Sequence, residues 1–129
     1  MLGDERGGKI MAGAIVHFEV PSGDVDRASG FWSGLFGWQI SASVMGEYDY
    51  RMFDAGEKQG GALMPSDKAG TGLIVYFGTD DIDASVAKVR ELGGTAAEKQ
   101  PVPTHGWFAV CADTDGNGFS LWQPDENAA

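Results

Sequence analysis

The sequence predicts an α+β fold of two tandem βαβββ modules whose curved, mixed sheets form a cleft. Two observations lead to this prediction. A strand pattern, a helix pattern and three short strand patterns follow one another, and the same order recurs about 57 residues later. In addition, 20 of the 129 residues are glycine, about twice the usual share, and glycines mark turns between short elements. A chain of this length forms one compact domain without disulfide staples.

The first module opens with a strand at 15–20 whose side chains alternate between two faces. Phe18 lies on one face with its apolar neighbours, and His17 and Glu19 lie on the other. A single helix covers only one face of such a sheet, so the other face is left to line the cleft. We therefore expect His17 and Glu19 to face the cleft.

An amphipathic helix is predicted over 25–36, with Asp24 as its N-cap and Gly37 as a left-handed C-cap. Five apolar residues recur at helical spacing and are expected to form its buried stripe: Ala28, Phe31, Trp32, Leu35 and Phe36. Three short strands follow, near 38–44, 48–53 and 61–65. Tyr48 and Tyr50 share one face of the middle strand, and the sequence leaves open whether this face is the inward one.

The second module repeats this order. A strand at 73–77 precedes a helix that begins after Asp81 and is closed by Gly93 and Gly94. Matching residues stand 57 apart early in the modules and 59 apart later, among them Asp24 with Asp81, Gly37 with Gly94, and Asp54 with Asp113. The predicted organisation is a flexible N-terminal arm at 1–13, modules at 14–65 and 73–124, a linker at 66–72 and a tail at 125–129.

Composition limits the classes of partner. Nineteen acidic residues against nine Lys and Arg give a net charge of −10, which argues against nucleic acid and anionic membranes as partners. The negative field favours a neutral or cationic ligand. Cys111 is the only cysteine, so an internal disulfide and a four-thiolate zinc site are excluded. The chain has neither a long apolar run nor a signal-peptide pattern, and a cytoplasmic protein is expected.

The motifs of this repeat resemble those of the vicinal oxygen chelate superfamily, the glyoxalase/bleomycin-resistance/dioxygenase proteins. The resemblance covers about residues 14–124 and is closest to the small actinobacterial-type glyoxalase-like domain branch. It is carried by these segments: Val16-His17-Phe18-Glu19-Val20, Phe31-Trp32-Ser33-Gly34-Leu35-Phe36-Gly37-Trp38, Glu91-Leu92-Gly93-Gly94 and Phe119-Ser120-Leu121-Trp122-Gln123-Pro124. It implies the glyoxalase/bleomycin-resistance fold.

The resemblance also implies where a metal would bind. Metal enzymes of the superfamily use a His on the first strand and a Glu on the last strand of each module. His17 matches one such position, whereas the other three correspond to Ile74, Gly61 and Ser120, which are not ligands of this kind. Glu19 adds one acid, which is too few. The sequence therefore predicts no metal and no cofactor.

Two groups of candidate residues follow. His17 and Glu19 are the candidate catalytic pair, because an imidazole and a carboxylate can exchange protons near neutral pH. Candidate ligand-binding residues are those that can stack on or hydrogen-bond to a planar molecule in the cleft: Tyr76, Trp122, Ser120, Trp107 and His105.

The leading hypothesis is a small-molecule-binding protein without the family metal site, which holds a small hydrophobic, aromatic or cationic ligand. One alternative is a lyase or isomerase that acts on a dicarbonyl or an adduct, with His17 or Glu19 as acid or base. Another is a divergent metal-dependent glyoxalase or dioxygenase that combines His17 and Glu19 with residues of another chain. A homodimer is a further expectation, and whether the protein is an enzyme stays open.

Overall fold

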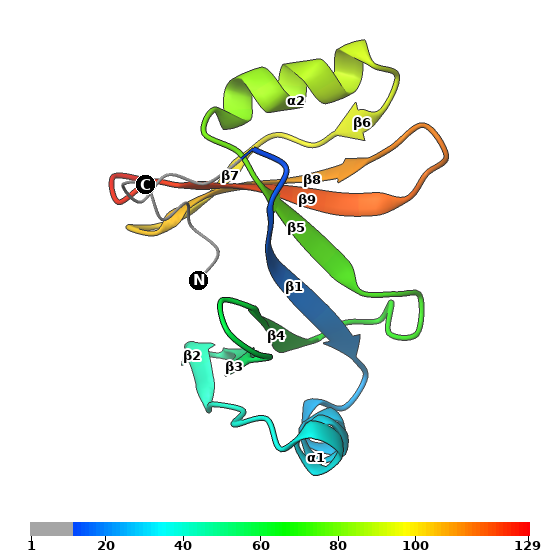
Figure 1. Cartoon of the computed structure of the whole chain (residues 1–129), viewed down its shortest axis with the longest axis vertical. Coiled ribbons are helices and arrows are strands. Elements are labelled where there is room, and N and C mark those ends of the chain that lie inside the picture. Colours follow the sequence, from blue (N-terminus) through cyan, green and yellow to red (C-terminus); the bar gives the residue numbers. More distant parts are fainter. Residues whose placement is uncertain (1–11) are drawn as a thin grey trace. The chain divides into compact units, whose positions relative to one another are not determined.

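The computed structural model describes residues 12–129 (Figure 1). The flexible arm predicted at 1–13 therefore lies outside the described residues, apart from its last two positions. The chain divides into two compact units: His17–Ile74, and Val75–Ala129 together with the described residues before His17. Gly13 and Ala14 belong to the second unit, where they exchange backbone hydrogen bonds with Gly78.

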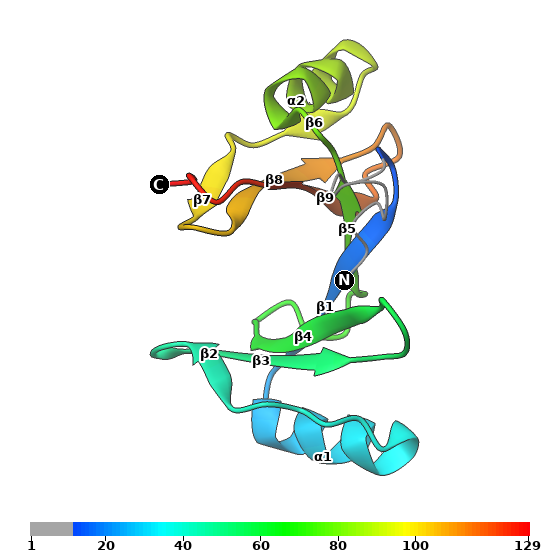
Figure 2. The same ribbon diagram turned by 60° about the vertical axis from the view of Figure 1, so that its left-hand side comes forward.

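The first unit has the predicted βαβββ order. Its elements are β1 (Ile15–Ser22), α1 (Val25–Phe36), β2 (Ser43–Met45), β3 (Tyr48–Asp54) and β4 (Gly60–Pro65). The strands lie in the order β2-β3-β4-β1, with β1 parallel to β4 and the other pairs antiparallel. Helix α1 runs along one face of β3 and β4 (Figure 2), which leaves the other face of these strands uncovered by a helix of this unit.

The second unit repeats this topology. It contains β5 (Ile74–Gly78), α2 (Ile82–Glu91), β6 (Thr95–Ala96), β8 (Gly106–Ala112) and β9 (Gly118–Pro124), with a short additional strand β7 (Gln100–Val102). The order β5-β9-β8-β6 corresponds to β1-β4-β3-β2, β5 is parallel to β9, and β7 pairs with β8. The internal repeat predicted from the sequence is therefore a repeat of topology as well.

Both helices begin where the sequence predicts. The Asp24 carboxylate accepts a hydrogen bond from the Arg27 N–H, and the Asp81 carboxylate accepts one from the Ala84 N–H. Gly37 closes α1 in the left-handed region, with a φ of 73°, and donates its N–H to the carbonyl of Ser33. These caps determine which helix residues lie over the sheet.

The predicted buried stripe of α1 is only partly right. Trp32 packs against the core of the first unit, which Val20, Phe53 and Leu63 help to form. In contrast, the side chains of Phe31, Leu35 and Phe36 are more than half exposed. Phe31 stands about 100° around the helix from Trp32 and so reaches solvent although it is apolar, and Leu35 and Phe36 lie in the last turn of the helix, directly before Gly37. The broad stripe read from the sequence was therefore wrong for these three residues.

The second core lies between α2 and its sheet. Ile82 and Val86 of α2 pack against Ala109, Cys111 and Leu121 of β8 and β9. Cys111 is buried and free, and burial raises the pKa of its thiol, as expected for a small core residue. Within the described residues, neither helix is long and apolar enough to cross a membrane.

Candidate functional site

His17 and Glu19 lie together on the face of the first sheet that points away from α1. Phe18 packs against the core beneath α1, and successive strand residues point to opposite faces. Tyr50 of β3 reaches the same face and connects the two residues. The structure thus confirms that His17 and Glu19 share a face opposite Phe18, and it adds a third residue.

The three side chains form a continuous hydrogen-bonded network. The distance between Tyr50 Oη and Glu19 Oε2 is 2.7 Å, and that between His17 Nε2 and Tyr50 Oη is also 2.7 Å. A phenol has a single hydrogen, which Tyr50 donates to the Glu19 carboxylate. His17 must then carry a proton on Nε2 and donate it to Tyr50.

The middle strand of the sheet allows this network to form. Glu19 on β1 and Met52 on β3 are both in register with Ala62 on β4. Tyr50 is two residues from Met52, so its side chain crosses β4 diagonally to reach Glu19. Because Ala62 offers only a methyl group on this face, it leaves room for the tyrosine ring. Ala62 is completely buried.

Burial determines the charges of the network. Burial lowers the pKa of His17 from 6.5 to about 4, so the imidazole is neutral at neutral pH. The Glu19 side chain is largely buried, with 8% of the residue exposed. Tyr48 lies beside Tyr50, and its pKa is raised first by burial and then by the negative charge of Glu19. The site therefore combines a neutral imidazole, a phenol and a carboxylate.

Tyr50 is the member of the network that the sequence did not select. The alternation of Tyr48 and Tyr50 was visible, but their strand has no apolar face long enough to identify the inward side. The structural signal is the position of Phe53, which packs in the core beneath α1 and so places Tyr48, Tyr50 and Met52 on the opposite face.

In the second unit, Tyr76, Ser120 and Trp122 share the face of the sheet that points away from α2. Tyr76 is in register with Ser120, and their neighbours Phe77 and Leu121 pack toward α2. Trp122 lies against the backbone of Gly106, where a Cβ atom would overlap its ring. Ser120 is completely buried, and its Oγ has no hydrogen-bond partner among the described residues.

Trp107 and His105 are placed elsewhere. Trp107 is on the α2 side of β8, where its Nε1 donates to Asp125 and Lys99 Nζ lies 4.5 Å from its ring centroid. His105 lies exposed in the turn before β8, with Nδ1 2.9 Å from the carbonyl oxygen of Pro103. These two candidates therefore do not share the face of Tyr76, Ser120 and Trp122.

The positions at which the family would hold a metal do not fit one here. The 59-residue offset paired Ser120 with Gly61, and the structure corrects this pairing. Gly61 and Leu63 are two residues apart on β4 and so share one face, and Leu63 packs under α1. Ser120, in contrast, points away from α2. The equivalent of Ser120 is therefore Gly60 or Ala62, and neither is a ligand.

Residues 12–129, which the structure describes, offer no other cluster of metal ligands. Within them, no group of three or more His, Cys, Asp and Glu side chains is arranged to hold a metal ion. Only His17, among the positions that the family uses, carries a ligating side chain, and its Nε2 is hydrogen-bonded to Tyr50. No chemical step is therefore assigned to a metal.

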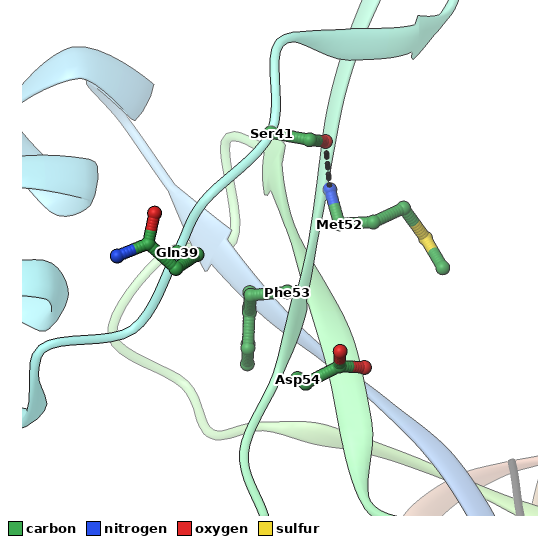
Figure 3. A pocket seen from close by; sticks show the side chains of 5 residues that line it. All are labelled: Gln39, Ser41, Met52, Phe53 and Asp54. Carbon is green, nitrogen blue, oxygen red and sulfur yellow. Dashed lines mark hydrogen bonds between the residues drawn. The ribbon is translucent and has the colours of Figure 1, made fainter.

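A shallow pocket of about 240 Å³ lies at the edge of the first sheet and is lined by Gln39, Ser41, Met52, Phe53 and Asp54 (Figure 3). Ser41 Oγ accepts a hydrogen bond from the Met52 N–H, which holds the segment before β2 against β3. In Figure 3 the side chains of Gln39 and Met52 point away from each other. The lining thus presents no convergent set of polar groups, and the network of His17, Tyr50 and Glu19 is the better candidate site.

In a comparison with protein families, the chain matches the model of the glyoxalase-like domain over residues 16–122. A putative glyoxylase, CFP32, of Mycobacterium tuberculosis is 32% identical over 116 residues, which are 87% of this chain and 44% of that protein. The anthracycline biosynthesis protein DnrV of Streptomyces peucetius is 32% identical over 133 residues, with 89% of this chain and 48% of that protein covered. The chain thus spans about half the length of the curated relatives it matches.

The solved structures show the fold. A glyoxalase/bleomycin resistance protein/dioxygenase superfamily member from Vibrio splendidus matches with a TM-score of 0.60 and 18% identity, over 82% of this chain and 95% of that one. A methylmalonyl-CoA epimerase from Mycobacterium tuberculosis matches with a TM-score of 0.67 and 13% identity, over 90% and 91% of the two chains. The architecture is therefore the glyoxalase/bleomycin-resistance fold, as the sequence predicted.

Proposed function

The chain belongs to the glyoxalase-like domain family, and from this premise we propose that it is a small-molecule-binding protein that anchors its ligand on the network of His17, Tyr50 and Glu19. The observation that carries the proposal is the pair of 2.7 Å hydrogen bonds that join these three side chains. Polar side chains held together on a sheet face supply the few fixed hydrogen-bonding groups that orient a ligand in a mostly apolar site.

The surroundings of the network support binding of an aromatic or apolar molecule. Tyr48 and Met52 lie on the same face and are both more than one third exposed. Aromatic and thioether side chains contribute apolar contact area without requiring a fixed partner geometry. The network therefore stands beside apolar side chains that a ligand can cover.

The proposal does not depend on a metal ion, because only His17 has a ligating side chain among the positions that the family uses. The test is titration of chelator-treated protein with divalent metal ions, followed by calorimetry. Stoichiometric, tight binding that is lost in His17→Gln would overturn the metal-independent form of the proposal.

A thermal-shift screen tests binding itself. The panel contains neutral, cationic and anionic aromatic compounds, and is applied to the wild-type chain and to Tyr50→Phe. A compound at about a hundred times its Kd stabilises the folded state by about 2.7 kcal/mol, a shift of several degrees. We expect stabilisation of the wild-type protein that is smaller in Tyr50→Phe and unchanged in the control Glu91→Gln, an exposed helix residue of the second unit. The absence of any stabilising compound would refute the proposal.

An enzymatic alternative has an observation in its favour. The hydrogen bonds from His17 through Tyr50 to Glu19 form a path along which a proton can move, and Glu19 is a buried carboxylate of the kind that removes protons next to carbonyl groups. A relative named a putative glyoxylase is consistent with such chemistry. The alternative predicts a lyase or isomerase that acts on a dicarbonyl or an adduct.

Deuterium incorporation distinguishes this enzyme from a binding protein. A dicarbonyl–thiol adduct is incubated with the protein in D₂O, and exchange at the carbon next to the carbonyl is followed by NMR. Exchange that the wild type catalyses and Glu19→Gln does not would establish the enzyme. Equal exchange with and without protein would leave the binding function alone.

A further inference from the structure

Helix α1 carries apolar side chains that its own unit leaves exposed. Phe31 is 61% exposed and Leu35 is 56% exposed, although Trp32 between them packs against the core. Phe31 and Leu35 are four residues apart on the helix and therefore stand one above the other, as a ridge here called the α1 ridge. In Figure 2, β3 and β4 lie on one side of α1, and no other element of the first unit lies on the opposite side. The α1 ridge is thus available to a partner.

A row of two glycines runs beside the ridge. Gly30 and Gly34 are also four residues apart, and a Cβ atom added at either position would meet nothing within 4 Å. Neither glycine has a positive φ, so the fold of the unit does not require glycine there, and glycine weakens a helix relative to alanine. What the two glycines do provide is a groove, here called the glycine groove, in which a second helix can approach the backbone closely.

The ridge and the groove lie side by side, so this face of α1 is complementary to a second copy of itself. When two copies meet across a two-fold axis, the ridge of each enters the groove of the other, as a closed dimer requires. An antiparallel pair also brings Arg27 of each copy toward the carboxyl end of the other helix, whose last turn contains no basic residue. The negative partial charge of a helix carboxyl end attracts a cation, so charge favours this orientation.

The distribution of charge along the chain favours the same occupant. With a net charge of −10, the chain as a whole repels a second copy. Residues 28–46, which begin within α1, contain no Asp, Glu, Lys, Arg or His. The face of α1 is therefore a place where two copies can meet without bringing like charges together.

We propose that α1 is the contact surface of a homodimer, in which the ridge of Phe31 and Leu35 on each copy packs into the glycine groove of the other. One face of a 12-residue helix offers less than the about 800 Å² per partner of a standard interface. The association is therefore weak, with an expected Kd of about 10 to 100 µM. This inference goes beyond the proposed ligand-binding function and holds or fails independently of it.

Sedimentation equilibrium of the full chain over a range of concentrations up to about 500 µM measures the association. Leu35→Lys places a charge in the contact and should raise the Kd by at least about tenfold. Leu92→Lys is the matched control, because Leu92 is 66% exposed at the end of α2 and the variant has the same net charge, so its Kd should equal that of the wild type. Added salt should lower the Kd of the wild type, because it screens the repulsion between two acidic copies.

Gly34→Ala separates a contact between copies from a role within the unit. Alanine favours a helix and has open space at this position, so the midpoint of urea denaturation should rise at concentrations where the chain is monomeric. The same methyl group fills part of the glycine groove, so the Kd of the dimer should rise by about tenfold. The variant is thus expected to stabilise the monomer and weaken the dimer.

Two kinds of result would overturn the proposal. One is a wild-type chain that stays monomeric up to about 500 µM, because the ridge would then have another partner or none. The other is a dimer that Leu35→Lys and Gly34→Ala leave intact, or that Leu92→Lys weakens equally, because the contact would then lie elsewhere. Circular dichroism verifies that each variant folds, and if Leu35→Lys does not, Gly34→Ala and the salt dependence of the wild type still test the proposal.

Discussion

The burial of His17 predicts a specific dependence of stability on pH. The pKa of His17 is about 4 in the folded protein and 6.5 for the unperturbed group. Between these values the unfolded chain binds a proton that the folded chain does not. The contribution of His17 to the free energy of unfolding is therefore fully present above pH 6.5 and is lost as the pH falls toward 4. At about 1.4 kcal/mol for each pH unit between the two pKa values, the loss amounts to about 3 kcal/mol.

Urea denaturation at several pH values between about 4 and 7 measures this loss. Many carboxylates also titrate in this range, so the informative quantity is the difference between the wild-type protein and His17→Gln. Glutamine is neutral throughout and keeps an N–H that can donate to Tyr50. The free energy of unfolding of the wild type should therefore fall by about 3 kcal/mol more than that of His17→Gln over this range.

The second histidine of the chain provides a matched control. His105 is exposed in the turn before β8, outside the network, and His105→Gln is measured alongside as the control for a histidine-to-glutamine change. Parallel curves for the wild type and His17→Gln would refute the reasoning. An NMR titration midpoint of the His17 ring near 6.5 would refute it as well, because the imidazole would then be hydrated in the folded protein.

Three further predictions concern stability. Tyr50→Phe removes two short hydrogen bonds, one of them to a carboxylate, and should lower the free energy of unfolding by about 2 kcal/mol in urea denaturation; an unchanged midpoint would contradict the network. Gly61→Ala places a Cβ atom against the carbonyl oxygen of Phe18, so β1 and β4 must separate, and the free energy of unfolding should fall by about 3 kcal/mol. Gly23→Ala is the control, because Gly23 has open space around it, and it should lower the free energy of unfolding by less than about 1 kcal/mol. Ser120→Ala removes a buried hydroxyl that has no partner among the described residues. Thermal unfolding should therefore show a stability that is unchanged or greater by up to about 1 kcal/mol. A clear loss of stability would show that the hydroxyl forms a hydrogen bond.

Local patterns along the chain were sufficient for the elements and their order. Asp24, Gly37 and Asp81 identify helix ends because capping depends on a few neighbouring residues. Alternation around Phe18 places His17 and Glu19 on one face, because a strand has a period of two. The repeat and the family resemblance then predicted the fold, which the structural comparisons show.

The site was predictable only in part, because hydrogen bonds between strands depend on register. Tyr50 joins His17 and Glu19 only because β3 and β1 flank β4, and because Ala62 leaves space between them. A register error of one residue exchanges the two faces of a strand, which is why the sequence offset paired Ser120 with Gly61 on the wrong face. Sequence by itself thus determined the topology and the pair His17 and Glu19. The tertiary structure decided that Tyr50 completes the network, because the separation of side chains on neighbouring strands is a property of the packed sheet.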